Sequence, residues 1–185
     1  VCDADEMTRL MEQSLDWPGP IYIRLAKGGD PIVSRPERGF SIGKAIAMRE
    51  ARVPRPVVLM ATGVMTTNCL AAATALAEQG IDCSVVHFHT VKPLDEAAVV
   101  LRARDARLVV TVEEGIKIGG FGSAVTDVLV AQRGQNLPAM LRLGIPDRFP
   151  DKYGSQNDLL ELFGLLPRQI AASVVEALTP TAQTS

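Results

Sequence analysis

The residues best suited to chemistry lie between positions 109 and 125, in the segment VVTVEEGIKIGGFGSAV. An apolar run typical of a buried strand ends there in two adjacent glutamates, Glu113 and Glu114. A glycine-rich loop follows, and then a helical pattern. The loop contains Gly119, Gly120 and Gly122. Backbone N–H groups freed by such glycines, at the positive end of a helix, can bind an anion.

This loop matches neither common phosphate-binding motif. No Lys-Ser/Thr pair follows the glycines, as a Walker loop requires, and a third glycine at dinucleotide-fingerprint spacing is missing. A tight strand-to-helix turn is therefore favoured over an anion site. Glu113 and Glu114 are neighbours on a strand and point to opposite faces, so they are poorly placed to act as one acid–base pair. We expect one of them to cap or pair locally and the other to be solvated.

The two histidines, His87 and His89, can share a face at the end of a predicted strand. No nearby cysteine or third histidine completes a metal-binding set with them, so we expect strand-end residues at an interface rather than metal ligands. The three cysteines, Cys2, Cys69 and Cys83, are far apart and form no CxxC pair. This spacing favours reduced, buried thiols over a zinc site or a disulfide framework. The sequence thus predicts no catalytic and no metal-binding set.

Two cations follow a short β-rich run at residues 21–25 and precede the pair Gly28-Gly29. They are Arg24 and Lys27. A lysine there could contact a phosphate as a point charge. A solvated basic rim is an equally open alternative.

Composition limits the class of protein. The chain has 185 residues, of which 47% are hydrophobic and 22% charged, with a net charge of -2. This balance argues against a nucleic-acid-binding face. No apolar run approaches the ~20 residues that span a membrane, and the start lacks a signal-peptide pattern. We expect a cytoplasmic protein. The chain opens without Met, one residue before a helical pattern, as though cut from a larger protein.

Strand and helix patterns alternate at least three times between residues 42 and 143. Helices are predicted at 3–15, 42–50, 67–79, 95–104, 123–132, 155–163 and 167–178. Strands are predicted at 21–25, 57–61, 83–88, 108–112 and 139–143. This alternation predicts an α/β fold with a doubly wound, mostly parallel sheet and helices on both faces.

Five segments in order resemble a known family. They are residues 21–28 (IYIRLAKG), 57–63 (VVLMATG), 89–95 (HTVKPLD), 109–125 and 143–149 (LGIPDRF). Together they resemble the C-terminal part of the transketolase-like family of thiamine-diphosphate enzymes, over nearly the whole chain. The resemblance implies the C-terminal α/β domain of that family, which helps to build a dimer.

The resemblance also implies domain boundaries. Residues 1–29 resemble the C-terminal remnant of a pyrimidine-binding domain, 30–40 a linker, and 41–178 the transketolase C-terminal domain, with a frayed tail at 179–185. The diphosphate motif and the activating glutamate of the family belong to upstream segments. We therefore expect thiamine diphosphate and its divalent metal in the full enzyme, and no cofactor-binding residue in this fragment.

One functional residue carries over by position. In sugar-phosphate members of the family, an arginine after the last strand of the pyrimidine domain contacts the substrate phosphate, and Lys27 occupies the matching position. Lysine keeps the charge but lacks the bidentate fork. Arg24 is a second candidate. The loop from Glu113 to Gly122 is expected to face a partner subunit.

Three functions follow from this resemblance and from the loop. The first is a fragment of a transketolase that transfers a two-carbon ketol unit between sugar phosphates, inactive alone and serving assembly with upstream domains or a subunit, in a homodimer. The second is a fragment of 1-deoxyxylulose-5-phosphate synthase. The third, from another class, is a non-catalytic anion- or effector-binding module that uses residues 119–123.

Overall fold

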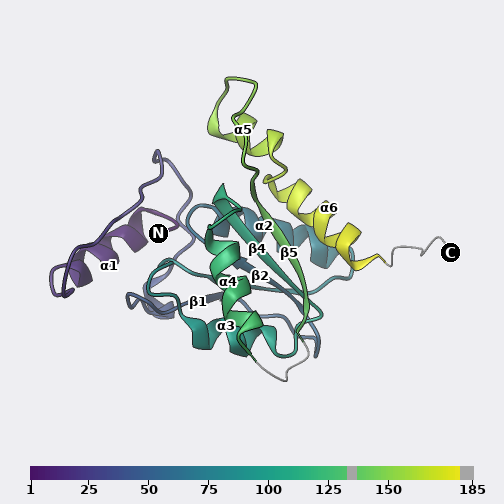
Figure 1. Cartoon of the computed structure of the whole chain (residues 1–185), viewed down its shortest axis with the longest axis horizontal. Helices are drawn as coiled ribbons and strands as arrows, with labels where there is room; N and C mark the ends of the chain where they lie inside the picture. Colours follow the sequence, from purple (N-terminus) through teal and green to yellow (C-terminus); the bar gives the residue numbers. More distant parts are fainter. Residues whose placement is uncertain (133–136, 180–185) are drawn as a thin grey trace.

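A five-stranded sheet in the order β1-β3-β2-β4-β5 forms the centre of the chain in a computed structural model (Figure 1). The structure describes residues 1–132 and 137–179. The strands are β1 (Ile46–Arg49), β2 (Val57–Ala61), β3 (Cys83–His87), β4 (Leu108–Ile116) and β5 (Ala139–Ile145). β1 pairs with β3 in antiparallel fashion, and the other neighbours are parallel. The predicted mostly parallel, doubly wound sheet is therefore confirmed.

Helices cover both faces of this sheet. Their bounds are α2 (Met65–Glu78), α3 (Glu96–Ala103), α4 (Phe121–Val130), α5 (Gln156–Leu162) and α6 (Pro167–Leu178). Successive strand residues point to opposite faces. Leu59 of β2 accordingly lies in a core cluster with residues of α2 and α6, while Val58 and Met60 lie in a second cluster with residues of α3 and α4. All of β2 is buried, which explains its continuous apolar run.

Local signals fix where several helices begin. Ser155 and Asp158 form a capping box at the start of α5, and Pro167 occupies the first turn of α6. Asp95 caps α3 by accepting a hydrogen bond of 3.2 Å from the Ala98 N–H. The four parallel strands and these helices lie within a few residues of their predicted positions. Of the predicted tail, residues 180–185 lie outside the described part of the chain.

The N-terminal segment stands apart from both helix layers. Helix α1 (Ala4–Ser14) lies beside the sheet, and a long irregular connection with one 3-10 turn, η1 (Pro36–Arg38), leads from it to β1 (Figure 1). Asp3 caps α1 by accepting a hydrogen bond of 2.9 Å from the Glu6 N–H. The predicted strand at residues 21–25 is wrong: the segment has no regular secondary structure and pairs with no described strand, and its side chains are mostly exposed.

The predicted helix at residues 42–50 is also wrong. The segment contains β1, in which Ile46 and Met48 are buried and their neighbours half-buried. Gly43 has a positive φ of 83°, which a helix does not contain. Ile46 pairs with His87 at the edge of the sheet. Pairing with β3 thus overrides the helical preference of alanine and methionine in this stretch.

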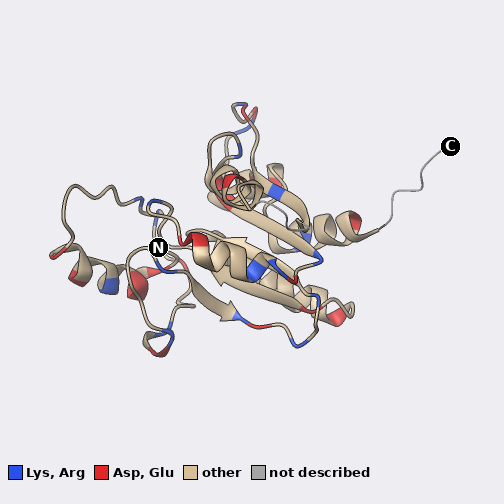
Figure 2. Ribbon diagram, turned by 60° about the horizontal axis from the view of Figure 1, so that its bottom comes forward, with Lys and Arg blue, Asp and Glu red and all other residues tan. Residues whose placement is uncertain are grey.

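Charges of both signs are scattered over the ribbon rather than gathered on one face (Figure 2). In the part of the chain that the structure describes, no helix is long and apolar enough to cross a membrane.

Candidate functional site

The carboxyl ends of β2, β3 and β4 form the edge at which doubly wound sheets usually bind ligands. The chain passes from β2 to β3 on one side and returns to β4 on the other side of β2, which places a topological switch point between β2 and β4. Gly63, with a φ of 57°, turns the chain just after β2. The Val1 carbonyl oxygen lies 3.7 Å from where a Cβ on Gly63 would be. The N-terminal residues therefore contact this edge.

Glu113 fills the anion position of the glycine loop. Its Oε2 accepts a hydrogen bond of 2.8 Å from the Phe121 N–H, and its Oε1 accepts one of 2.8 Å from the Gly122 N–H. These N–H groups belong to the first turn of α4, where a negative charge is favoured. The side chain is buried. An external anion would have to displace Glu113 to reach the same donors.

The loop glycines are required by this arrangement. A Cβ on Gly120 would overlap the carboxylate of Glu113, and one on Gly122 would lie 2.6 Å from Thr111 Oγ1. Gly119 has a φ of 69°, which favours glycine. The expectation of a tight turn with one glutamate capping locally is confirmed.

Glu114 behaves differently from the expected solvated residue. It is half-buried, and its Oε1 accepts a hydrogen bond of 2.8 Å from Gln156 Nε2. The bond links the end of β4 to the first residue of α5. The two adjacent glutamates therefore serve separate contacts, as their alternation along the strand requires.

The tip of the loop is held from within. Ser123 Oγ donates to the Lys117 carbonyl at 3.0 Å and accepts from the Gly119 N–H at 3.0 Å. Arg142 donates to Ser123 Oγ at 2.9 Å and also to the Lys117 carbonyl. Ile118 nonetheless exposes 73% of its surface at this tip. The loop is thus an internally bonded turn with an apolar residue facing solvent.

The two predicted phosphate contacts are exposed. Arg24 Nη1 lies 4.0 Å from where a Cβ on Gly115 would be, so this guanidinium lies beside the end of β4. Among the described residues, neither Arg24 nor Lys27 makes a side-chain hydrogen bond or an ion pair. Arg24 is brought near Glu113 at the end of β4.

A second buried group joins α1 to the carboxyl end of β3. His87 Nε2 lies 2.9 Å from Glu6 Oε2, and His87 Nδ1 lies 2.7 Å from Thr66 Oγ1. The Cys2 N–H donates to Glu6 Oε2 at 2.7 Å. Burial raises the pKa of Glu6, but the hydrogen bond and charge of His87 outweigh it and hold the pKa at about 2.

This group corrects the expectation drawn from sequence spacing. Cys2 lies beside His87 in space, although the two residues are far apart in the sequence. Glu6 lies in the first turn of α1, where a carboxylate suits the helix dipole, but its side chain faces the protein interior and is fully buried. Burial, Glu6 and Asp3 together raise the pKa of the Cys2 thiol. Sequence spacing carries no signal for this contact, because Glu6 and His87 are 81 residues apart.

Asp3 binds the segment at residues 33–34, which belongs to the connection between α1 and β1. Its Oδ2 accepts hydrogen bonds from the Val33 and Ser34 N–H groups at 2.8 and 2.7 Å, and its Oδ1 accepts from Ser34 Oγ at 2.7 Å. Nearby, His89 stacks on Phe40 with ring centroids 4.2 Å apart. The start of α1 is therefore tied both to the sheet and to residues 33–40.

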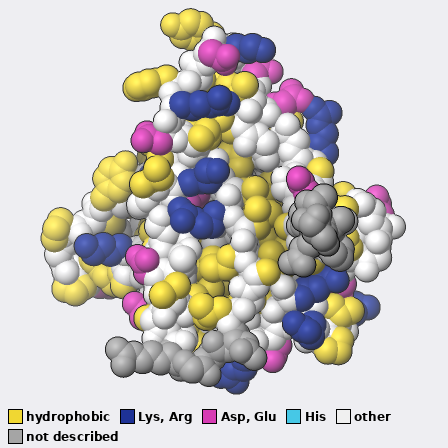
Figure 3. Space-filling model, turned by 45° about the vertical axis from the view of Figure 1, so that its right-hand side comes forward, with side chains coloured by type: hydrophobic (Ala, Val, Ile, Leu, Met, Phe, Trp, Pro, Cys, Tyr) yellow, Lys and Arg dark blue, Asp and Glu magenta, His cyan; other side chains and the backbone are white. Residues whose placement is uncertain are grey.

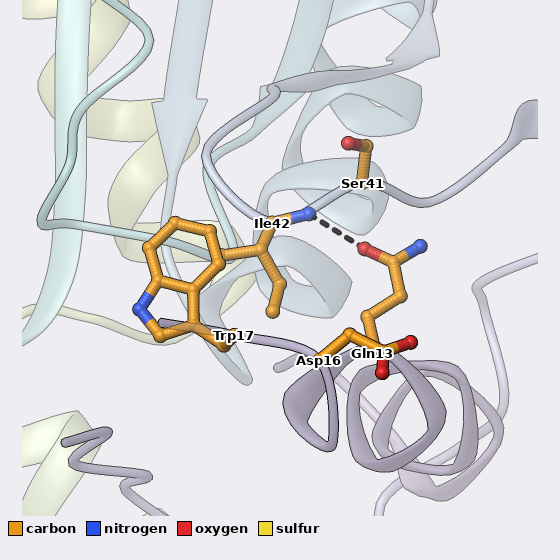
Figure 4. Close-up of a pocket in the computed structure, with 5 residues that line it drawn as sticks. All are labelled: Gln13, Asp16, Trp17, Ser41 and Ile42. Carbon is orange, nitrogen blue, oxygen red and sulfur yellow. Dashed lines mark hydrogen bonds between the residues drawn. The ribbon is translucent and has the colours of Figure 1, made fainter. Parts of the chain in front are cut away.

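A shallow cavity of about 250 Å³ lies between the end of α1 and residues 41–42 (Figure 4). Gln13 reaches from α1 and accepts a hydrogen bond of 3.0 Å from the Ile42 N–H, while Trp17 faces the Ile42 side chain. The volume is below the ~300–1,000 Å³ of typical ligand sites. Asp16 is the one ionisable residue in its lining. The cavity is a seam between segments rather than a catalytic pocket.

Comparison with known proteins agrees with this architecture. The family model for the transketolase C-terminal domain matches residues 45–170. The chain is 38% identical over 181 residues to a transketolase family protein of Sinorhizobium fredii, covering 96% of this chain and 50% of the relative. It is 38% identical to a 6-deoxy-6-sulfo-D-fructose transketolase subunit of a Clostridium species, covering 94% and 52%. It is also 38% identical to the 1-deoxy-D-xylulose-5-phosphate synthase of Gloeobacter violaceus, covering 96% and 27%.

Solved structures give the same result. A split-gene transketolase, solved as an inactive beta4 tetramer, matches with a TM-score of 0.84 and 35% identity over 96% of this chain and 56% of that chain. A transketolase of Campylobacter jejuni matches with a TM-score of 0.55 at 20% identity, covering 78% and 20%, which supports the fold alone.

The sheet order and these matches define a doubly wound α/β domain of the transketolase type. The chain belongs to the transketolase C-terminal domain family, as its five matched segments indicated. It spans about half the length of the first two curated relatives and about a quarter of the third.

Proposed function

We propose that this chain is the C-terminal part of a transketolase-type enzyme that transfers a two-carbon ketol unit between sugar phosphates. The observation that carries the proposal is the family match over residues 45–170 in a chain that spans half of its transketolase relatives. In this view residues 1–29 end a pyrimidine-binding domain, 30–40 form a linker, and 41–178 form the C-terminal domain. The complete protein would be a cytoplasmic homodimer.

The glycine loop supports assembly over ligand binding. A diphosphate would need the N–H groups of Phe121 and Gly122, and Glu113 already accepts from both. Thiamine diphosphate therefore does not fit this loop, and the proposal places it, with a divalent metal, on upstream segments. When bound there, the cofactor supplies the electron sink for ketol transfer. The same contacts weaken the alternative of an anion- or effector-binding module at residues 119–123.

Docking of the upstream part is supported by the unpaired segment at residues 21–25. Its side chains include Tyr22 and Leu25, which expose 89% and 64% of their surfaces. A backbone without a strand neighbour offers free N–H and C=O groups to another sheet. We infer that these residues complete a sheet of the upstream domain.

Dimerisation is supported by exposed apolar side chains beside the glycine loop and around α5. Ile116 and Ile118 expose 49% and 73% of their surfaces beside the glycine loop. The projecting segment around α5 also exposes hydrophobic side chains (Figure 3), among them Phe149 and Tyr153. Sedimentation of the reconstituted enzyme tests this: Ile118→Asp should weaken dimerisation, and an unchanged dimer would remove the loop from the interface.

The catalytic proposal is tested by reconstitution. The chain is mixed with the upstream half of a transketolase relative, thiamine diphosphate and a divalent metal, and ketol transfer between sugar phosphates is measured. Activity should need both halves, and turnover by the chain alone would contradict the proposed domain boundaries. Formation of 1-deoxyxylulose 5-phosphate, when a 2-oxo acid replaces the ketose as two-carbon donor, would favour the alternative, a fragment of 1-deoxyxylulose-5-phosphate synthase, which the 38% identity to that enzyme supports.

A further inference from the structure

Three potential metal ligands meet where α1 contacts the end of β3. Cys2 Sγ, a carboxylate oxygen of Glu6 and an imidazole nitrogen of His87 all lie within 4.8 Å of one another. Cys2 exposes 1% of its surface, and the other two expose none. These separations are close to those between ligands of one tetrahedral ion, so small side-chain movements would bring all three into coordination.

The chemistry of the three donors suits a zinc-class ion. Thiolate, imidazole and carboxylate are the ligand types that Zn²⁺ uses, and a thiolate excludes the hard cations Mg²⁺ and Ca²⁺. One thiolate and one carboxylate also neutralise a divalent charge in a buried place. The hydrogen bonds of His87 also suit a metal ligand. Nδ1 contacts Thr66 Oγ1 at 2.7 Å, as a metal-binding imidazole usually contacts a second group, and Nε2 faces Glu6.

Hydrogen bonds within the group leave donor atoms unused. Glu6 Oε1 is buried without a hydrogen-bond partner among the described residues. Cys2 Sγ has a long contact of 3.6 Å with Asp3 Oδ2. Asp3 itself is occupied by N–H groups of three residues, so it acts as a neighbour rather than a ligand. A buried carboxylate oxygen of this kind needs a partner, and a thiol and an imidazole lie beside it.

We propose that Cys2, Glu6 and His87 bind a divalent zinc-class cation that fastens α1 to the carboxyl end of β3. On binding, the Cys2 S–H bond breaks, a metal–sulfur bond forms and the proton passes to solvent. The proton shared by His87 Nε2 and Glu6 Oε2 also passes to solvent, so that Nε2 binds the ion through its lone pair while Nδ1 keeps its contact with Thr66. Glu6 exchanges its bond to His87 for one to the ion, with Oε1 available as a fourth donor. The ion would fix the N-terminal segment on the sheet, a role that goes beyond the proposed ketol transfer and does not depend on it.

Cobalt substitution tests the site directly. The 185-residue chain, prepared with a removable C-terminal tag free of histidine, is stripped with a chelator and titrated with Co²⁺. We expect one Co²⁺ per chain and a thiolate-to-cobalt charge-transfer band in the near ultraviolet. The band should be lost in Cys2→Ser and kept in the matched control Cys83→Ser, which changes a cysteine remote from the group. A folded wild-type chain without the band, or a band that survives in Cys2→Ser, would overturn the proposal.

Thermal unfolding supplies a second readout that needs no activity. Zn²⁺ at ~100 times its dissociation constant should raise the Tm of the wild-type chain by about 5–10 °C. The rise should vanish in Cys2→Ser and persist in His89→Gln, which changes the neighbouring histidine. Glu6→Gln and His87→Gln should also abolish the rise. If either variant fails to fold, the cobalt spectrum of Cys2→Ser decides the question. An equal rise in wild type and Cys2→Ser contradicts the site even if ketol transfer is later demonstrated.

Discussion

Oε2 of Glu113 accepts a hydrogen bond of 2.8 Å from the backbone N–H of Phe121, the first residue of α4. After a glycine-rich loop, the N-terminus of a helix often binds an anionic ligand. Here the carboxylate of Glu113 occupies that position instead. What looks in the sequence like a phosphate cradle is an internal brace between β4 and α4. This relationship connects the fold to the proposed role in assembly, because it leaves the outer side of the loop for a partner.

Removal of the brace should destabilise the chain. Glu113→Ala leaves two buried N–H groups of α4 without an acceptor, at a cost of about 2–4 kcal/mol in the free energy of unfolding. Gly120→Ala forces the carboxylate aside and should cost about 1–3 kcal/mol. Chemical denaturation measures both. The matched control Glu114→Gln keeps a carbonyl acceptor for Gln156 and should change stability by less than ~0.5 kcal/mol.

The two changes should also be less than additive. Once Glu113 is alanine, a methyl group on Gly120 still meets the Ile116 carbonyl oxygen but no longer meets a carboxylate, so Gly120→Ala should cost less in that background. Strict additivity in the double-mutant cycle would show that Gly120 is needed for another reason.

Much of the sheet is predictable because its signals are local. The unbroken apolar run of β2 indicates burial on both faces, and the Ser155–Asp158 pair indicates where α5 begins. Residues 42–50 and 21–25 are mispredicted because partners decide their state. Ile46 becomes part of a strand only by pairing with His87, and residues 21–25 have no strand beside them. Local propensity carries no information on either partner.

In the candidate sites too, contacts between residues close in sequence are predictable and contacts between distant residues are not. The capping role of Glu113 is predictable because the glutamate and its donors are 8 and 9 residues apart. The contact between Glu6 and His87 spans 81 residues and depends on how α1 folds back on the sheet. No spacing rule reports such a pair, and Glu6 equally suits the positive end of α1.

The thiols of the core should be unreactive in the native chain. Burial raises the pKa of Cys83 to about 11, and burial also raises the pKa of Cys69. Because the thiolate is the reacting species, iodoacetamide at pH 8 should label neither residue until denaturant is added. Peptide mapping by mass spectrometry measures the labelling. Rapid native labelling of Cys69 would mean that α2 opens far more readily than its packing implies.

The start of α5 should depend on its capping box. Ser155→Ala removes the acceptor of the Asp158 N–H and should cost about 0.5–2 kcal/mol. Hydrogen bonds from the Ser155 hydroxyl and N–H lower the pKa of Asp158. The lowered pKa adds stability at a pH above the ordinary pKa of aspartate, and this stability is lost as the pH falls through the folded value. Asp158→Asn should flatten that acid-side loss, and an unchanged pH profile would contradict it.

The unpaired segment should matter for association but not for folding of the chain itself. Tyr22→Asp and Leu25→Asp place charge on exposed apolar positions, so each should weaken binding to the upstream half by ~5–30-fold. Thermal stability of the isolated chain should change by less than ~0.5 kcal/mol. Leu101→Asp is the control, since Leu101 on α3 is similarly exposed at 61%. If all three variants lose the same amount of affinity for the upstream half, residues 21–25 do not form a specific contact with it.

Lys27 should affect the phosphate of the substrate and little else. In the reconstituted enzyme, Lys27→Ala should lower kcat/KM by about 10–100-fold, the range expected for one charge-assisted contact, chiefly through KM. Lys27→Arg should keep the charge and add a bidentate fork, and so retain or improve binding. Arg24→Ala tests the second candidate, and Lys152→Ala controls for loss of an exposed cation.

A substrate lacking its phosphate makes the assignment sharper. Wild type and Lys27→Ala should use the dephosphorylated sugar equally poorly, because the missing contact is the same in both cases. If Lys27→Ala instead lowers turnover of both substrates by the same factor, the residue acts on folding or docking and not on the phosphate. If Arg24→Ala alone produces the phosphate-specific loss, the contact belongs to the guanidinium beside Gly115, which already lies at the carboxyl edge of β4.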